Sequence, residues 1–306
     1  MKVVDPHIHL WDTSAVSYPW LANPTMAYSG DNRLLPKPYD VTAFLQDIQD
    51  IEVLHTVNVE ANPADPVAEV RWLQSLSLNT PNRGHPHGIV AYADLSKPDA
   101  PAALDRLAAY PTVRGIRQIL NIHPNPHYNY VSTDYLSDPQ WRANLARLTQ
   151  YGWSFDLQIY PVQAAGAAEV IRSNPGLEFI LDHTGMFVDR NTVQGWLEWR
   201  SALRTLALYD NTSIKLSGLA MFDHRWTVES FRPLVLEAIE CFGVKRCMFA
   251  SNFPIDRLHT SYTSLWHAYA QIVSGMSAAE RDNLFVYNAT RYYRLLSDQR
   301  DSWKSL

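Results

Sequence analysis

The sequence is poor in cysteine and has no excess of basic residues, and each shortage excludes a class of protein. Only Cys241 and Cys247 occur among 306 residues, and they do not form the closely spaced thiol pairs that bind zinc or exchange disulfides. The 26 lysine and arginine residues are outnumbered by 31 acidic residues. They are spread thinly and form no stripe that could neutralise a nucleic-acid backbone. We therefore expect a reducing compartment, the cytoplasm, and no nucleic-acid partner.

Long hydrophobic runs and a leader-like start are also missing. No apolar segment approaches the roughly 20 residues of a membrane span. The chain enters a β-rich run at Val3 without a basic stretch or a small-residue cleavage site. We therefore expect no export signal and no membrane partner. The chain does have a globular balance of 46% hydrophobic and 19% charged residues, which predicts a substantial core.

Eight short β-rich runs recur along the chain, with helix-like segments between them. The runs cover 3–10, 55–60, 88–94, 113–120, 154–160, 178–182, 213–217 and 247–251. Helices are predicted over 41–51, 66–77, 100–109, 139–151, 161–173, 196–208 and 231–242. This alternation predicts an α/β protein in which residues 1–306 form one domain, a (β/α)₈ barrel of the TIM type.

The main structural alternative is an open, doubly wound sheet. That fold carries a glycine-rich phosphate turn after its first strand. Here the first run leads into His7-Ile8-His9, so the barrel is favoured. Residues 12–36 have no periodic pattern, and we expect them to form a long loop over the barrel mouth.

Polar residues end or follow most of the predicted strands. Because the C-terminal strand ends and their loops surround the mouth of such a barrel, these residues are expected to converge on one site. They are His7, His9, Glu60, Arg117, Asp156, Gln158, Asp182, His183, Asn252 and Asp256.

The spacing of His7 and His9 is informative. Residues two apart on a strand point to the same face, which in a barrel is the inside. Two neutral imidazoles with a carboxylate can hold a divalent cation such as zinc and leave a position for water. The alternative is a pair of buried histidines held by hydrogen bonds. The position at the end of the first strand, with His183 ending the sixth, favours the functional interpretation.

Three motifs together resemble a known family. Asp5-Pro6-His7-Ile8-His9-Leu10-Trp11-Asp12, Leu181-Asp182-His183-Thr184-Gly185 and the segment from Met248 to Asp256 (MFASNFPID) are similar to signatures of the amidohydrolase superfamily. Within it they resemble the amidohydrolase-2 branch, which contains sugar lactonases (L-fuconolactonase and L-rhamnonolactonase) and the 2-pyrone-4,6-dicarboxylate lactonase. Tyr18-Pro19-Trp20-Leu21 resembles the sugar lactonases in particular.

The resemblance implies roles for individual residues. His7 and His9 correspond to the first-strand pair and His183 to the sixth-strand histidine, and these three are the predicted metal ligands. Asn252 stands where the superfamily usually has an aspartate that ligates metal and accepts a proton. A neutral amide cannot be a general base, so Asp256 is the nearest carboxylate for that role.

Two further departures from the family pattern concern the metal. Gln158 stands where metal-dependent members often place a histidine, and the fourth strand offers no lysine to bridge two metals. A binuclear centre is therefore not expected. The resemblance leaves open one divalent metal, zinc foremost, or a metal-free site. In the metal-free version His7, His9 and Arg117 polarise an ester carbonyl while a carboxylate activates water.

Several side chains keep two interpretations. Arg117 binds the carbonyl or a substrate carboxylate, or forms a structural ion pair inside the barrel. Glu60 binds metal or sugar hydroxyls, or pairs with an arginine. Asp182 orients the strand end, and Lys215 lines the site or pairs with a carboxylate. Trp11, Trp20, Tyr28 and Phe253 form substrate walls or pack the loop. The histidines of 85–87 and 123–127 lie in proline-broken loops and are left outside the site.

The sequence therefore predicts a lactone hydrolase that acts on a small molecule. The predicted catalytic residues are His7, His9, Arg117, His183 and Asp256, and the predicted substrate-binding residues are Trp11, Trp20, Glu60, Gln158 and Asn252. Two alternatives stay open, a metal-dependent decarboxylase of an aromatic acid, against which Asn252 argues, and a binding barrel without catalysis. Assembly into a homo-oligomer is also left open.

Overall fold

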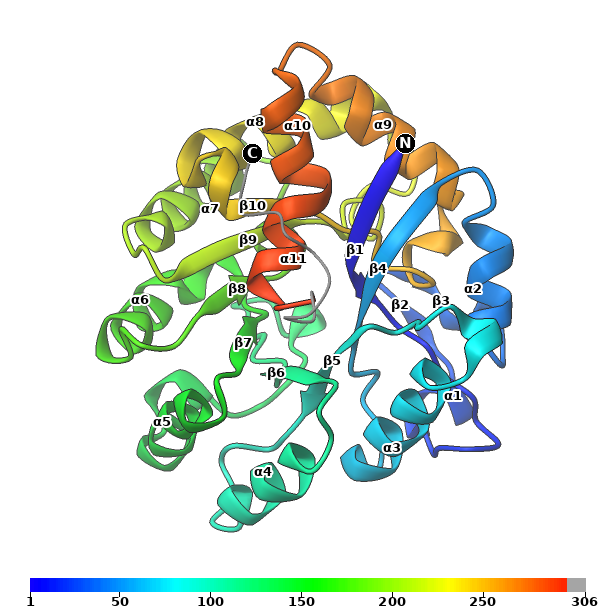
Figure 1. Ribbon diagram of the computed structural model, residues 1–306. Helices are drawn as coiled ribbons and strands as arrows, with labels where there is room; N and C mark the ends of the chain where they lie inside the picture. Colours follow the sequence, from blue (N-terminus) through cyan, green and yellow to red (C-terminus); the bar gives the residue numbers. More distant parts are fainter. Residues whose placement is uncertain (296–306) are drawn as a thin grey trace.

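Eight parallel strands form the barrel at the centre of the molecule (Figure 1). The computed structural model describes residues 1–295. The strands, hydrogen-bonded in this order, are β1 (Lys2–Ile8), β4 (Glu52–Val59), β5 (Gly88–Tyr92), β6 (Val113–Arg117), β7 (Ser154–Leu157), β8 (Phe179–Leu181), β9 (Thr212–Leu216) and β10 (Cys247–Phe249). Each predicted run overlaps one of them, so the predicted (β/α)₈ barrel is confirmed.

The first and last strands meet at the mouth end of the barrel. The Ile8 and Phe253 backbones form an isolated parallel bridge, and the His9 N–H donates to the Phe253 carbonyl at 2.7 Å. The Asn252 N–H donates to the His7 carbonyl at 2.9 Å. These bonds place the first and third sequence motifs side by side, although about 245 residues separate them along the chain.

An outer layer of helices covers the strands. It consists of α2 (Val41–Asp47), α3 (Pro66–Ser77), α4 (Ala100–Ala108), α5 (Pro139–Ala146), α6 (Ala164–Ser173), α7 (Val193–Ala207), α8 (Val228–Phe242) and α9 (Tyr262–Ile272). Side-chain caps set several starts: α7 and α8 each begin three residues before the predicted position because Thr192 and Thr227 accept backbone N–H bonds there. The predicted helix 139–151 continues after α5 as the 3₁₀ turn η5 (Arg147–Tyr151), and 161–173 begins with η6 (Pro161–Gln163).

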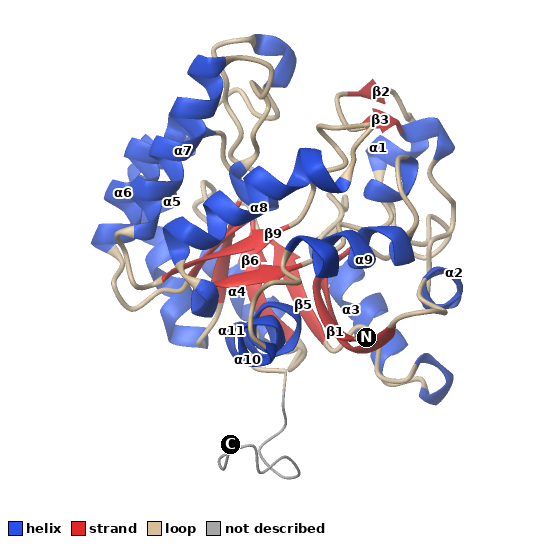
Figure 2. Ribbon diagram, turned by 90° about the horizontal axis from the view of Figure 1, so that it is seen from above, coloured by secondary structure: helices blue, strands red, loops and turns tan. Residues whose placement is uncertain are grey.

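The chain after α9 closes the end of the barrel opposite the mouth. It contains α10 (Ala278–Asp282), the π-helical turn η10 (Asn283–Tyr287) and α11 (Asn288–Tyr292); neither these elements nor α9 was predicted. Tyr292 and Tyr293 pack against inward-facing side chains of the strands, including Val4, Val57 and Met248. Figure 2 shows α10 and α11 at one end of the barrel and the β2–β3 hairpin at the other.

Residues 12–36 contain short elements of their own. These are α1 (Pro19–Ala22), the antiparallel pair β2 (Met26–Ala27) and β3 (Gly30–Asp31), and the turn η1 (Asn32–Leu34). Two indole N–H groups fix the segment, since Trp11 donates to the Pro36 carbonyl at 2.8 Å and Trp20 to the Ala61 carbonyl at 2.7 Å.

The remaining short turns lie in the loops between strands and helices. They are η2 (Thr80–Asn82), η3 (Pro126–Tyr128), η4 (Tyr135–Ser137), η7 (His183–Gly185), η8 (Val244–Arg246) and η9 (Asp256–Leu258). Among the described residues, no helix is both long and apolar enough to cross a bilayer.

Candidate active site

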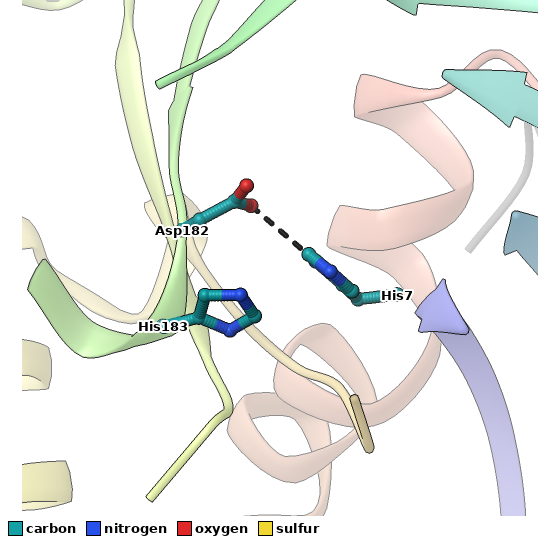
Figure 3. Close-up of side chains that lie close together, drawn as sticks. All are labelled: His7, Asp182 and His183. Carbon is teal, nitrogen blue, oxygen red and sulfur yellow. Dashed lines mark ion pairs between the residues drawn. The ribbon is translucent and has the colours of Figure 1, made fainter. Parts of the chain in front are cut away.

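Three imidazoles converge inside the mouth end of the barrel. The His7 ring centroid lies 5.0 Å from that of His9 and 4.5 Å from that of His183. All three side chains are buried. Figure 3 shows His7, from β1, facing Asp182 and His183, which follow β8. The sequence motifs at the ends of the first and sixth barrel strands therefore supply one common cluster.

The backbone that carries His183 is strained. His183, Thr184 and Met186 have φ between 52° and 55°, and Gly185 has φ 76°. Left-handed residues other than glycine cost of order 1–3 kcal/mol each and persist where the surrounding structure enforces them, often at functional sites. Gly218 makes room for the ring, since a Cβ there would lie 2.7 Å from His183 Nδ1. This turn presents the imidazole to the barrel interior at a cost in stability, which supports a functional role for it.

Burial keeps the three imidazoles neutral. It lowers the pKa of His9 to about 3, with a further contribution from Arg117, and it lowers the pKa of His183 to about 3. Burial and then Lys215 lower the pKa of His7 well below its ordinary value. A neutral imidazole has one N–H donor and one lone pair, so the contacts of each ring decide what it can do.

Those contacts differ among the three rings. His9 Nδ1 lies 2.8 Å from the Val59 carbonyl, which can only accept, so Nδ1 carries the proton and Nε2 keeps the lone pair. His183 Nδ1 lies 3.2 Å from the Ser217 hydroxyl. His7 Nε2 is buried and has no hydrogen-bond partner among the described residues. A ligand is therefore the natural partner for that nitrogen.

A buried cation lies against the histidine cluster. Lys215 Nζ is 2.5 Å from Asp156 Oδ2, 3.0 Å from Asp182 Oδ1 and 3.1 Å from His7 Nδ1. The Asp156 carboxylate also accepts from the Tyr293 hydroxyl, at 3.0 Å and 2.9 Å. Burial alone raises the pKa of Asp182, but Lys215 and His7 outweigh burial and hold this pKa well below its ordinary value. Asp182 is therefore ionised.

Arg117 forms a buried ion pair, which is one of the two interpretations that its sequence context left open. Its Nε donates to Glu60 Oε1 at 2.7 Å, one terminal nitrogen donates to the Glu60 carbonyl at 2.7 Å, and the other donates to Gln158 Oε1 at 3.0 Å. Gln158 in turn donates to Asn121 Oδ1 at 3.1 Å. Glu60 is thus already paired, and two of the five N–H groups of Arg117 make no hydrogen bond to the described residues, although one terminal nitrogen also lies 3.9 Å from Asp182 Oδ2.

Glu60→Ala should destabilise the protein strongly, because it leaves the buried Arg117 guanidinium without its carboxylate. Breaking a buried pair in this way costs about 3–5 kcal/mol. Glu60→Gln keeps an acceptor and should cost clearly less. Urea unfolding measures both, with Glu52→Ala as the control, because the Lys2–Glu52 pair is well exposed and should contribute little. Equal losses from Glu60→Ala and Glu52→Ala would contradict the prediction.

Asn252 and Asp256 form a buried pair behind the histidines. Asn252 Nδ2 donates to Asp256 Oδ1 at 2.8 Å, and the Ala220 N–H donates to Asp256 Oδ2 at 3.3 Å. The Asn252 side chain also lies within hydrogen-bond reach of His9. Burial raises the pKa of Asp256 to about 7. The Asp256 carboxyl group is therefore in direct contact with the Asn252 amide, which stands where the resemblance implies an aspartate.

The donor groups nearest to a cation site are His7, Asp182 and His183, whose ligand atoms all lie within 4.8 Å of one another. This set contains Asp182 in place of the predicted His9. Two imidazoles and a carboxylate suit zinc in type. However, Lys215 Nζ is in contact with both Asp182 and His7, two of the three groups. Because a divalent metal at these residues would lie beside this fixed cation and compete with it, the residues fit a resident metal poorly.

The other predicted wall residues lie outside this cluster. Trp11 is buried against Trp20 and Tyr39, at ring distances of 5.6 Å and 6.1 Å. Phe253 packs on Tyr262. Their observed contacts are therefore those of packing residues.

A separate aromatic group from the loops that follow the strands was not predicted as a unit. Tyr28 of the β2–β3 hairpin stacks on Phe222 at 5.7 Å, and His123 contacts Tyr128 and Tyr160 at 5.2 Å and 5.4 Å. Tyr28 is one of the predicted wall residues, and the richness in aromatic residues is the only sequence signal for the rest of the group. His85, another of the loop histidines that were left outside the site, hydrogen-bonds to Thr56 on β4.

An eight-stranded parallel barrel with acid–base side chains grouped at the C-terminal strand ends defines this protein as a barrel enzyme. A family model described as Amidohydrolase (Amidohydro_2) matches residues 4–295. The chain therefore belongs to the amidohydrolase-2 family, as the sequence motifs predicted.

Similar proteins cover the whole chain. A protein of Sinorhizobium fredii described as uncharacterized protein y4mH is 41% identical over 96% of this chain and 99% of its own. An L-fucono-1,5-lactonase of Burkholderia ambifaria is 25% identical over 95% of both chains. An amidohydrolase from Burkholderia multivorans, whose crystal structure is described with bound zinc, superimposes with a TM-score of 0.78 at 22% identity, over 97% of this chain and 100% of that chain. This last similarity concerns the fold alone.

Proposed function

We propose that the protein hydrolyses a lactone, and that its substrate is a sugar-derived lactone. The observation that carries the proposal is the convergence of His7, His9 and His183, all neutral and buried, at the C-terminal strand ends. The L-fucono-1,5-lactonase of Burkholderia ambifaria, similar over nearly the whole chain, supports the choice of a lactone. Water attack on an ester carbonyl needs groups that polarise the carbonyl and a group that accepts a proton.

The polarising groups are the imidazole edges and the free N–H groups of Arg117. A carbonyl oxygen placed among His7, His183 and Arg117 would receive hydrogen bonds where negative charge develops. Donors fixed in advance within a buried site are worth more than donors in water. Gln158 and Glu60 hold the guanidinium in place, since both bond to it directly. We therefore assign them a supporting role in binding.

Asp256 is the proposed proton acceptor. Its pKa, raised to about 7 by burial, is close to the value that suits a base at neutral pH. The oxygen of the attacking water bonds to the carbonyl carbon and loses one proton. A second water, between the attacking water and Asp256, relays this proton to the Asp256 carboxylate beside Asn252. The bond between the carbonyl carbon and the ring oxygen then breaks. The ring oxygen leaves as a hydroxyl with that proton, and the product is an open-chain hydroxy acid.

A substrate screen tests the function. The purified protein should hydrolyse at least one compound in a panel of L-fucono-1,5-lactone, other aldonolactones and 2-pyrone-4,6-dicarboxylate, followed with a pH indicator. A cognate substrate should give kcat/KM of at least about 10⁴ M⁻¹ s⁻¹. 2,6-Dihydroxybenzoate, assayed for release of carbon dioxide, is the control for the decarboxylase alternative. Release of carbon dioxide, or binding of lactones without turnover, would overturn the proposal.

A further inference from the structure

The groups around the Lys215 ammonium define the role of this side chain. Its ammonium carries three N–H donors and no acceptor. Three acceptors lie around it, namely Asp156 Oδ2, Asp182 Oδ1 and His7 Nδ1, at 2.5, 3.0 and 3.1 Å. The side chain is fully buried, so no water competes for these donors. Asp156 Oδ2 accepts a hydrogen bond from the ammonium, His7 Nδ1 lies within hydrogen-bond distance of it, and Asp182 Oδ1 forms an ion pair with it.

This arrangement determines which nitrogen of His7 carries the proton. A lysine ammonium can only donate, so Nδ1 must offer its lone pair. The other neighbour of Nδ1, Asp182 Oδ1, is farther away at 3.4 Å and forms an ion pair with Lys215. A proton on Nδ1 would point at a positive charge. In a neutral His7 the proton therefore belongs on Nε2.

We propose that Lys215 is a positioning residue that holds His7 as the Nε2–H tautomer, so that His7 donates a hydrogen bond to the substrate instead of ligating a metal. Nε2 is a buried nitrogen with no partner among the described residues, and a donor left unpaired there costs free energy until a ligand accepts its hydrogen bond. The carbonyl oxygen of a lactone is such an acceptor. The catalytic part of this inference rests on the proposed function, whereas the tautomer does not.

Tyr293, the residue after α11, supports Lys215 from the closed end of the barrel. The Tyr293 hydroxyl donates to Asp156, and its ring centroid lies 5.2 Å from Lys215 Nζ. Asp156 is thereby fixed in the position that accepts from Lys215. Contacts of this kind set the tautomer of histidines in other sites, where the group bonded to one ring nitrogen determines the role of the other. The residue that follows α11 thus contributes to the site from the closed end of the barrel.

The tautomer can be measured directly on the wild-type protein. Long-range ¹H–¹⁵N spectra of protein labelled with ¹⁵N-histidine separate the two ring nitrogens, and the missing signals in His7→Gln assign His7. We expect the Nε2–H pattern between pH 6 and pH 8. The Nδ1–H pattern, or an imidazolium, would overturn the proposal whatever the lactone screen gives. The Nε2–H pattern in a protein without lactonase activity would leave Lys215 as assigned and overturn only the proposed function.

Two variants test the consequence for the reaction. Lys215→Met removes the donor, so Asp182 can accept a hydrogen bond from a protonated His7 Nδ1, and Nε2 becomes available to a cation. We expect kcat to fall by roughly 100-fold with a smaller change in KM, and zinc binding, measured by calorimetry, to tighten at least about 10-fold. Lys97→Met, at an exposed lysine, is the control and should change neither. Unchanged kcat and unchanged zinc affinity in Lys215→Met would overturn the proposal.

Tyr293→Phe covers the case in which Lys215→Met does not fold. It keeps every charge and the ring beside Lys215 and removes only the bonds to Asp156. We expect kcat to fall several-fold while KM stays unchanged, because Lys215 and His7 are held less firmly. A change confined to thermal stability, with wild-type kcat, would show that Tyr293 is structural only and would contradict the supporting role.

Discussion

His183→Asn should reduce lactone hydrolysis by about 10²–10³-fold and leave the protein folded. Asparagine tolerates the left-handed backbone at φ 54°, which alanine does not, and its amide can keep the contact that His183 Nδ1 makes with Ser217. What disappears is the Nε2 edge of the imidazole. Loss of one polarising group at an oxyanion costs a factor of this size. Steady-state kinetics on the lactone found in the screen measures the loss.

The matched control is His127→Asn. His127 is exposed, lies in the loop after β6 and has its ring against Tyr128, so its replacement should leave kcat unchanged. Circular dichroism and the melting temperature show whether each variant is folded. Wild-type kcat in a folded His183→Asn protein would exclude His183 from catalysis. The strained turn 183–186 would then need a purely structural explanation.

The barrel and the histidine cluster could be predicted because both depend on local patterns. An inward-facing pair such as His7 and His9 follows from the alternation of side chains along a strand. The C-terminal ends of barrel strands meet at one mouth, so His183 could be grouped with that pair.

The partners of the charged residues could not be predicted in the same way. Lys215 pairs with Asp156 on β7 and with Asp182, which follows β8, and Arg117 pairs with Glu60. Each pair depends on how neighbouring strands are staggered around the barrel, which the sequence does not state. For Arg117 the sequence left two interpretations open. The stagger of the strands brings it into an ion pair with Glu60.

Tyr293 was missed for a different reason. The helices after β10 are short, and α10, η10 and α11 follow one another without a clear amphipathic period. Their apolar residues pack against the closed end of the barrel, so they do not form a surface stripe. A tyrosine at the end of such a segment has no sequence signal that would assign it to the interior of the barrel. Its bond to Asp156 is a consequence of tertiary packing alone.

Asp256→Asn should abolish most of the activity and, at the same time, stabilise the folded protein at neutral pH. A proton acceptor with pKa about 7 is lost, and such groups contribute about 10²–10⁴-fold to rates. In the wild type, kcat/KM should rise with pH through about 7 as Asp256 ionises. The residual activity of the variant should lack this step. A pH series of kcat/KM for both proteins measures the difference.

The stability effect has the opposite sign to the activity effect. Burial raises the pKa of folded Asp256 from 3.8 to about 7, so the unfolded chain releases this proton at lower pH than the folded chain does. Between about pH 4 and pH 7 the free energy of unfolding therefore decreases as pH rises, by up to about 4 kcal/mol. The amide that replaces the carboxyl group in Asp256→Asn cannot ionise, so this decrease disappears. Urea midpoints should agree at pH 4, and the variant should be higher at pH 7.5.

The double variant Asn252→Asp with Asp256→Asn separates the base from its position. It keeps one carboxyl and one amide in the buried pair, whose atoms are 2.8 Å apart, and moves the carboxyl to the place beside His9. If a carboxylate at this pair accepts the proton from water, the double variant should recover at least about 10-fold over Asp256→Asn. A folded Asp256→Asn protein with wild-type kcat/KM and an unchanged pH profile would contradict the role of Asp256. Asp182, ionised and in contact with Lys215, would then be the carboxylate left next to the histidines.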